Sequence, residues 1–155
     1  MKKILLLLTI IPCLSFGQDW KQKFGGADSD EGDAVLFAVV EDPPIFYNCD
    51  RSAPRKDKQL CFQQGVMQHI IDNFEYPAIS KEMGISERII VNFHVNKEGR
   101  IINVRAVKGQ DKHLKAEAIR LVKSIPTLIP AKQRGQAVSC SFTVPISFTL
   151  EERDK

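Results

Sequence analysis

The sequence predicts an α+β fold in which two helices pack on one face of a small antiparallel sheet. Two amphipathic patterns with helical spacing, over residues 59–74 and 111–125, predict the helices. Three runs of alternating apolar residues, over residues 88–96, 101–107 and 138–150, predict the strands. Each helix has one apolar stripe and the sheet one apolar face, and both are buried only against another element. We therefore expect a core with the order helix, strand, strand, helix, strand.

The first helix is expected over residues 59–74. Its apolar residues recur mainly at intervals of four positions, which is typical of a helix with one buried face; they are Phe62, Val66, Met67, Ile70, Ile71 and Phe74. Gly65 weakens this helix by up to about 1 kcal/mol. The helix should end before Pro77, because proline disfavours helical geometry in the residue that precedes it. Residues 78–83 then add a short helical turn.

A hairpin and the second helix follow. The two strands of the hairpin meet at a turn over residues 97–99. Their alternating apolar positions are Ile89, Val91, Phe93 and Val95, and then Ile102, Val104 and Ala106. Asp111 is expected to cap the second helix by accepting hydrogen bonds from its first N–H groups. The apolar stripe of that helix consists of Leu114, Ala118, Leu121, Val122 and Ile125.

The last strand has the most regular pattern in the chain. Over residues 138–150, apolar and polar residues alternate without interruption, so one face of this strand should be buried. Pro145 occupies a polar position and has no N–H to donate, which disfavours a strand that is paired on both sides. We therefore expect this strand to lie at an edge of the sheet or to contain a bulge.

Residues 1–17 are typical of a signal peptide. Lys2 and Lys3 precede a mostly apolar run, and small residues stand at the positions that a signal peptidase recognises, at Ser15 and Gly17. We expect cleavage after Gly17 and export of the remaining chain to the periplasm.

Two alternatives to simple export are a membrane anchor and a lipoprotein. As a helix, residues 3–17 reach about 22 Å, whereas the apolar core of a bilayer is about 30 Å thick. Lipidation of Cys13 is disfavoured because Pro12 does not resemble the small residue that a lipoprotein peptidase expects. Contact with a membrane is thus expected only if the leader is retained or lipidated. Residues 18–34 are expected to form a flexible polar linker, and residues 151–155 a short tail.

Residues 35–58 are expected to form an extension with a short strand and a cysteine-containing loop. In an oxidising compartment, a disulfide between Cys49 and Cys61 would close a short polar loop and stabilise the fold by about 2–4 kcal/mol. Cys140 lies on the apolar side of the last strand, which is typical of a small buried residue. An odd thiol stays free or pairs between chains, which leaves a homodimer open.

Composition and motifs argue against several classes of function. The net charge of +3 includes two lysines of the leader and is too small for a nucleic-acid-binding surface. The sequence has no zinc-finger spacing of Cys and His, no glycine-rich phosphate loop and no nucleophile elbow. His69, His94 and His113 fall on three separate predicted elements. We therefore expect no enzymatic activity, no cofactor and no bound metal.

Several stretches, taken in order, resemble the TonB C-terminal domain family. They are residues 76–77, 84–85, 89–95, 99–101 and 114–125, followed by residues 126–130, 132–135 and 142–148. The resemblance covers about residues 35–150, with the domain itself over 59–150. The extension with Cys49 and Cys61 is similar to that of a subgroup. One departure is at Glu87 and Arg88, where the family usually has a glycine before the strand.

The resemblance implies a periplasmic module that binds the TonB-box peptide of outer-membrane receptors and takes part in TonB-dependent transport. In this family the peptide adds to the sheet as an extra strand. The last strand is the best candidate for that edge, and its polar positions are Ser139, Ser141, Thr143, Pro145 and Ser147. Energy transduction does not follow, because the sequence shows neither a transmembrane helix nor a long proline-rich arm. The alternative function is a periplasmic adaptor that binds another extended peptide or its own copies.

Overall fold

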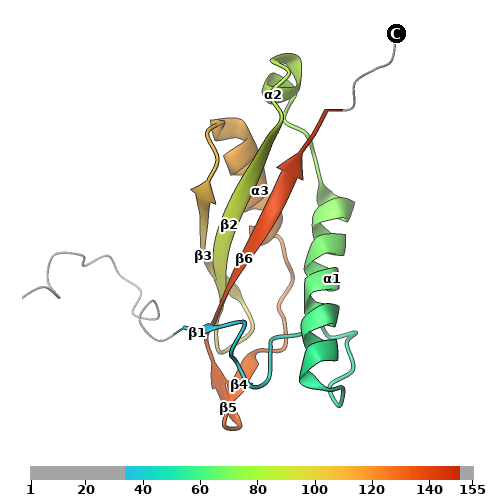
Figure 1. Ribbon diagram of the computed structural model, residues 1–155, viewed down its shortest axis with the longest axis vertical. Helices are drawn as coiled ribbons and strands as arrows, with labels where there is room; N and C mark the ends of the chain where they lie inside the picture. Colours follow the sequence, from blue (N-terminus) through green and yellow to red (C-terminus); the bar gives the residue numbers. More distant parts are fainter. Residues whose placement is uncertain (1–33, 151–155) are drawn as a thin grey trace, which may run out of the picture.

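The computed structural model describes residues 34–150 and confirms the α+β class, with helices packed on one face of a sheet (Figure 1). The predicted signal peptide, nearly all of the linker and the tail lie outside the described residues. The elements are β1 (Val35–Leu36), α1 (Arg55–Asn73), α2 (Ala78–Glu82), β2 (Glu87–Val95), β3 (Ile101–Lys108), α3 (Lys112–Lys123), β4 (Ala131–Gln133), β5 (Gln136–Val138) and β6 (Cys140–Phe148).

The main sheet has four strands in the order β1-β6-β2-β3. The central strand β2 pairs antiparallel with β3 on one side and with the whole of β6 on the other. The short strand β1 lies parallel to the start of β6, with Val35 opposite Cys140 and Leu36 opposite Ser141. Within the described chain, β6 therefore has strand partners on both sides only over its first two residues.

The core lies between the sheet and the helices α1 and α3. Figure 1 shows α3 behind the sheet and α1 alongside β6. The largest fully buried side chains of this core include Phe62, Val66, Ile89, Val91, Phe93, Leu114, Leu121 and Phe148. Burial of one such side chain contributes about 1.5–3 kcal/mol. As predicted, Asp111 caps α3, since its carboxylate accepts hydrogen bonds from the N–H groups of His113 at 3.0 Å and Leu114 at 2.8 Å.

Helix α1 begins earlier than the sequence predicted, at Arg55 instead of residue 59. It follows Pro54 directly, and proline is tolerated at this position because the N–H that it lacks would have had no partner within the helix. Asp57 in the first turn favours the same start, because a negative charge interacts well with the N-terminal end of a helix. Cys61 lies inside the helix, both in the predicted range and in the observed one.

The long last strand predicted over residues 138–150 is two strands in the structure. β5 pairs with β4 in a separate two-stranded sheet, and β6 begins only at Cys140. The β4–β5 turn contains Arg134 and Gly135 with φ angles of 51° and 75°, as expected for a tight hairpin. In the sequence, the alternation of apolar residues continues across Ser139. Such a pattern indicates which face of the chain is buried, but it does not indicate where one strand ends and the next begins.

Strand β3 contains a bulge at Asn103 that the apolar pattern did not predict. Asn103 has a φ angle of 53°, which asparagine tolerates better than most residues, and the register between β2 and β3 shifts at this point. Ile102 consequently lies opposite His94, on the side of the sheet away from the core. Ile101 packs against the core instead. The prediction that Ile102 shares the buried side of its strand is therefore wrong.

The extension before α1 is packed onto the domain and covalently attached to it. A disulfide joins Cys49 to Cys61, with 6.1 Å between the two Cα atoms, which confirms the predicted pairing. Cys140 is free and buried, also as predicted. The ring of Phe46 lies over Gly65 of α1, where a Cβ atom would come within 2.4 Å of the ring. Gly65 thus provides the space into which the extension docks.

Candidate functional site

The outer edge of β6 is unpaired over most of the strand. Beyond Ser141, no strand of the described chain pairs with β6 on the side opposite β2. In Figure 1 this edge faces helix α1. An unpaired edge presents main-chain N–H and C=O groups that are able to pair with another strand.

The register shows which main-chain groups point outward. The carbonyl of Ser141 accepts a hydrogen bond from the N–H of Phe37, at 3.2 Å, so the main-chain groups of Ser141 point away from β2. This direction alternates along a strand, and the pairing of β6 with β2 has no break. The main-chain groups of Thr143, Pro145 and Ser147 therefore also point toward the free edge.

This orientation explains how Pro145 is accommodated. Pro145 lies opposite Ile90 of β2, yet the N–H that it lacks would have pointed away from β2. The β2–β6 ladder therefore loses no hydrogen bond at this position. An incoming strand meets the N–H groups of Thr143 and Ser147 and the carbonyl groups of all three outward-facing residues.

The polar residues predicted as the binding edge occupy two different environments. Ser139 and Ser141 lie beside β1, and Ser139 is buried. Thr143, Pro145 and Ser147 are exposed and lie along the unpaired part of β6. The structure thus brings three of the five predicted residues together at the free edge, and their role in binding stays a prediction.

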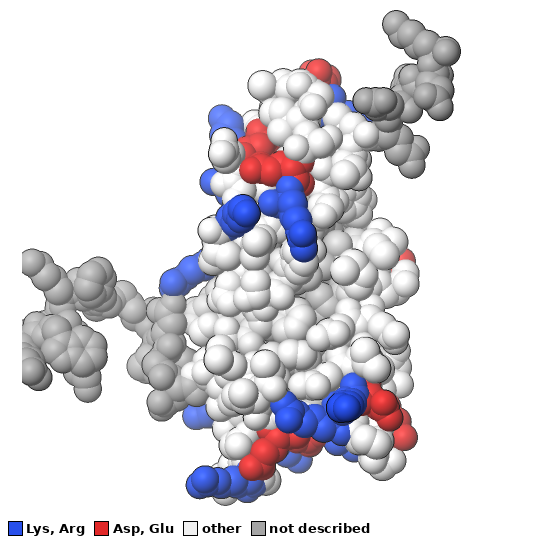
Figure 2. Space-filling view, viewed as in Figure 1, with Lys and Arg blue, Asp and Glu red and all other residues white. Residues whose placement is uncertain are grey.

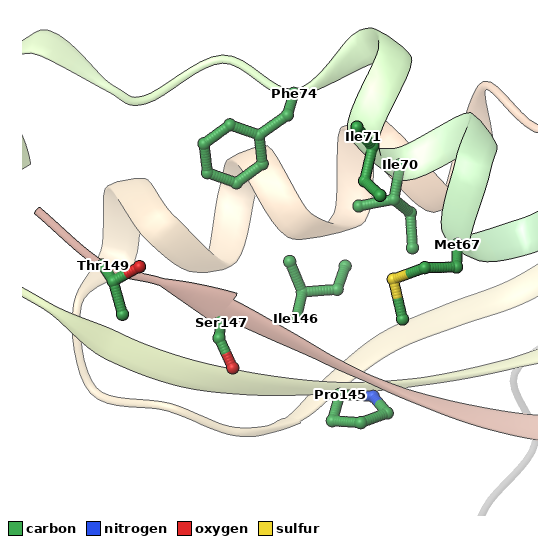
Figure 3. A pocket seen from close by; sticks show the side chains of 8 residues that line it. All are labelled: Met67, Ile70, Ile71, Phe74, Pro145, Ile146, Ser147 and Thr149. Carbon is green, nitrogen blue, oxygen red and sulfur yellow. The ribbon is translucent and has the colours of Figure 1, made fainter. Parts of the chain in front are cut away.

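An apolar groove of about 400 Å³ runs between this edge and helix α1 (Figure 3). It is lined by Met67, Ile70, Ile71, Phe74, Pro145, Ile146, Ser147 and Thr149. Its volume lies within the usual range for ligand pockets. None of these side chains is charged, and Figure 2 shows that the middle of this face of the molecule is almost without Lys, Arg, Asp and Glu.

The helical side of the groove was not predicted as part of a site. The apolar spacing of the helix assigned Met67, Ile71 and Phe74 to the buried stripe. In the structure, Met67 is 46% exposed, Ile71 61% and Phe74 38%. The sequence did contain a signal for this side of the groove. The apolar residues of the helix span a wider arc than one buried stripe needs, because Met67 and Ile71 lie beside the stripe formed by Phe62, Val66 and Ile70.

The opposite edge of the sheet, formed by β3, is less suited to strand addition. The bulge at Asn103 interrupts its regular pairing pattern, and the exposed residues Arg105 and Lys108 place charge along it. Bulges and charged side chains are common features that protect sheet edges from further pairing. The β6 edge carries neither feature beyond Ser141.

Within residues 34–150, no helix is long and apolar enough to cross a membrane. A family model described as the C-terminal region of the Gram-negative bacterial TonB protein matches residues 72–150. None of the curated proteins matches the chain.

Three solved structures to which this chain is similar come from two bacteria. Two are solution structures of the Helicobacter pylori TonB C-terminal domain. The first has a TM-score of 0.48, and the match covers 59% of this chain and 82% of the Helicobacter pylori chain. The second has a TM-score of 0.45, and the match covers 58% of this chain and 95% of the Helicobacter pylori chain. The Pseudomonas aeruginosa TonB C-terminal domain has a TM-score of 0.41 and covers 52% and 81%. Each is 22% identical to this chain. Because the family model extends from the end of α1 through β6 and matches about half of the chain, this protein belongs to the TonB C-terminal domain family.

Proposed function

We propose that this domain binds an extended peptide of an outer-membrane receptor in the periplasm, by adding the peptide as a strand to the free edge of β6, and so serves TonB-dependent transport. The observation that carries this proposal is the one-sided pairing of β6 beyond Ser141, with main-chain groups directed outward. Membership of the TonB C-terminal domain family supports the kind of partner. The signal-peptide pattern of residues 1–17 supports the compartment, and the Cys49–Cys61 disulfide is consistent with it.

Strand addition at this edge has a limited binding energy of its own. A net contribution of about 1 kcal/mol for each main-chain hydrogen bond gives about 3–5 kcal/mol from the groups between Thr143 and Ser147. Part of this is offset by the entropy lost when the peptide is ordered. Tight binding therefore needs additional contacts from peptide side chains.

Two substitutions at one position test the proposal. Thr143→Pro removes an outward-facing N–H, whereas Thr143→Val keeps this N–H and removes only the hydroxyl that accepts a hydrogen bond from Asn92 at 3.0 Å. We expect Thr143→Pro to abolish capture of a TonB-box peptide in a pull-down. Thr143→Val should change the affinity by less than about 1 kcal/mol, the size of one net hydrogen bond.

Circular dichroism provides the control, because Thr143→Pro must keep the native spectrum. The pairing with β2 predicts that it does, since the N–H of Thr143 does not point toward β2. A folded Thr143→Pro protein that still captures the peptide at full strength would show that the peptide binds elsewhere.

A further inference from the structure

We infer that the groove between α1 and β6 selects peptides with two apolar, uncharged side chains that are separated by one residue and both face the groove. This inference rests on the proposed function and adds the chemistry of the peptide to it. The occupant is a strand, because the wall formed by β6 offers unpaired main-chain groups next to exposed apolar side chains of α1.

The chain itself already places a short strand on this edge. β1 pairs with the first two residues of β6 and then leaves the edge at Phe37. The ring of Phe37 turns into the core, where its centroid lies 5.1 Å from that of Phe62 and 4.9 Å from that of Phe142. The unpaired edge begins where β1 ends, and the groove lies further along the same edge, from Pro145 onward. A bound peptide would therefore continue the line of β1 along β6.

Met67 and Ile71 lie outside the buried side of α1. Phe62, Val66 and Ile70 form the buried side of the helix. Figure 3 shows Met67 of α1 and Phe74, directly after the helix, extending into the space above β6, with Ile146 pointing up toward them. In the same view, Pro145 and Ser147 point to the other side of the strand.

The same alternation would hold for an added strand, because neighbouring strands of a sheet share their two faces. Every second side chain of the peptide would face Met67, Ile71 and Phe74, and the others would face solvent. A charged side chain in an inward position would lose water without gaining a partner, since the lining residues are all uncharged.

The length of the groove sets the number of inward positions. The helix rises about 10 Å between Met67 and Phe74, at about 1.5 Å per residue. Side chains on one face of a strand are about 6.7 Å apart, so a third one would lie about 13 Å from the first. The exposed part of the helix therefore covers two inward-facing side chains.

Two short synthetic peptides of identical composition test this inference by titration against the purified chain. Both contain threonine, serine and two valines. In the first peptide the valines are separated by one residue and share a face, and in the second they are adjacent and face opposite sides. We expect the first peptide to bind about tenfold more tightly, the effect of burying one further apolar side chain.

Two variants of α1 locate the effect. Ile71→Gln should remove the preference between the two peptides, because Ile71 lines the groove. The matched control is Leu60→Gln, on the same helix, where Leu60 is 54% exposed but does not line the groove. This control should keep the full preference, and both variants should keep the thermal stability of the parent protein because both side chains are mostly exposed.

The possible outcomes separate this inference from the proposed function. Equal binding of both peptides, with sensitivity to Thr143→Pro, would overturn the inference and leave strand addition standing. Absence of binding for both peptides, or binding that Thr143→Pro does not affect, would contradict both proposals. A dimer in sedimentation analysis that Ile71→Gln dissociates would show that a second copy of this chain fills the groove, and this also overturns the inference.

Discussion

Replacement of Gly65 by alanine should destabilise this protein, although alanine is the better helix former. In an isolated helix the change is stabilising by about 1 kcal/mol. In this protein, however, a Cβ atom at Gly65 would lie 2.4 Å and 2.5 Å from two carbons of the Phe46 ring. The ring must move, and it is also in contact with the core near Phe62, with 6.2 Å between the two ring centroids.

The magnitude follows from these two opposing effects. Overpacking of a well-packed site costs about 1–3 kcal/mol, against the gain of about 1 kcal/mol in helix propensity. The Gly65→Ala protein should therefore be destabilised by up to about 2 kcal/mol. In a Phe46→Ala background the obstacle is gone, and the same change should stabilise the protein by about 1 kcal/mol.

The measurement is a double-mutant cycle in urea, followed by far-UV circular dichroism under oxidising conditions so that the disulfide stays intact. The coupling energy between the two sites should be about 1–3 kcal/mol, the range expected for residues in contact. If Gly65→Ala stabilises both backgrounds equally, Phe46 does not pack on Gly65, and the docking of the extension described above is wrong.

Three further outcomes are expected. Reduction of the Cys49–Cys61 disulfide, with a sequence separation of 12, should lower the free energy of unfolding by about 3 kcal/mol; a urea midpoint unchanged by reductant would contradict this. Burial raises the pKa of the Cys140 thiol to about 12, so iodoacetamide at about pH 8 should label it only after unfolding; rapid labelling of native protein would show that the thiol is accessible. The N–H of Leu114 is the main cause that holds the pKa of Asp111 below its ordinary value, so the stability from the charged carboxylate is complete at neutral pH and is lost as the pH falls through that lowered pKa. The stability advantage of the parent over Asp111→Asn should therefore shrink below about pH 4, as urea midpoints at several pH values would show.

Much of the fold was predictable because periodicity reports which face of an element is buried. The buried stripe of α1, the apolar face of β2 and the cap at Asp111 all follow from residue spacing. The bulge at Asn103 and the break at Ser139 were not predictable in this way, because both depend on backbone conformation and leave the apolar alternation intact. Helix α1 was placed too late because its first four residues, 55–58, are all charged and carry no apolar pattern.

Of the candidate site, only the unpaired main-chain edge of β6 could be predicted from the sequence, and the apolar side chains of the groove could not. Pro145 correctly indicated a strand with one unpaired side, since a missing N–H matters only where a partner needs it. The side-chain half was missed because Met67 and Ile71 fit the helical spacing of a core residue. Whether such residues face the core or a groove depends on the position of the neighbouring strand, which the helix's own sequence does not contain.

The order of the strands has a consequence for how the molecule is made. Val35 and Cys140 pair with each other although they lie near opposite ends of the described chain, and the central strand β2 obtains its longest partner from the last element to be synthesised. Such distant pairing slows folding, because a long loop must close before its contacts form. A chain that ends before Cys140 would leave Val91 and Phe93 uncovered and exposed to aggregation. The strand that completes the core is also the one that carries the free edge. An incomplete chain therefore lacks the proposed peptide-binding edge, which exists only on molecules that have finished folding.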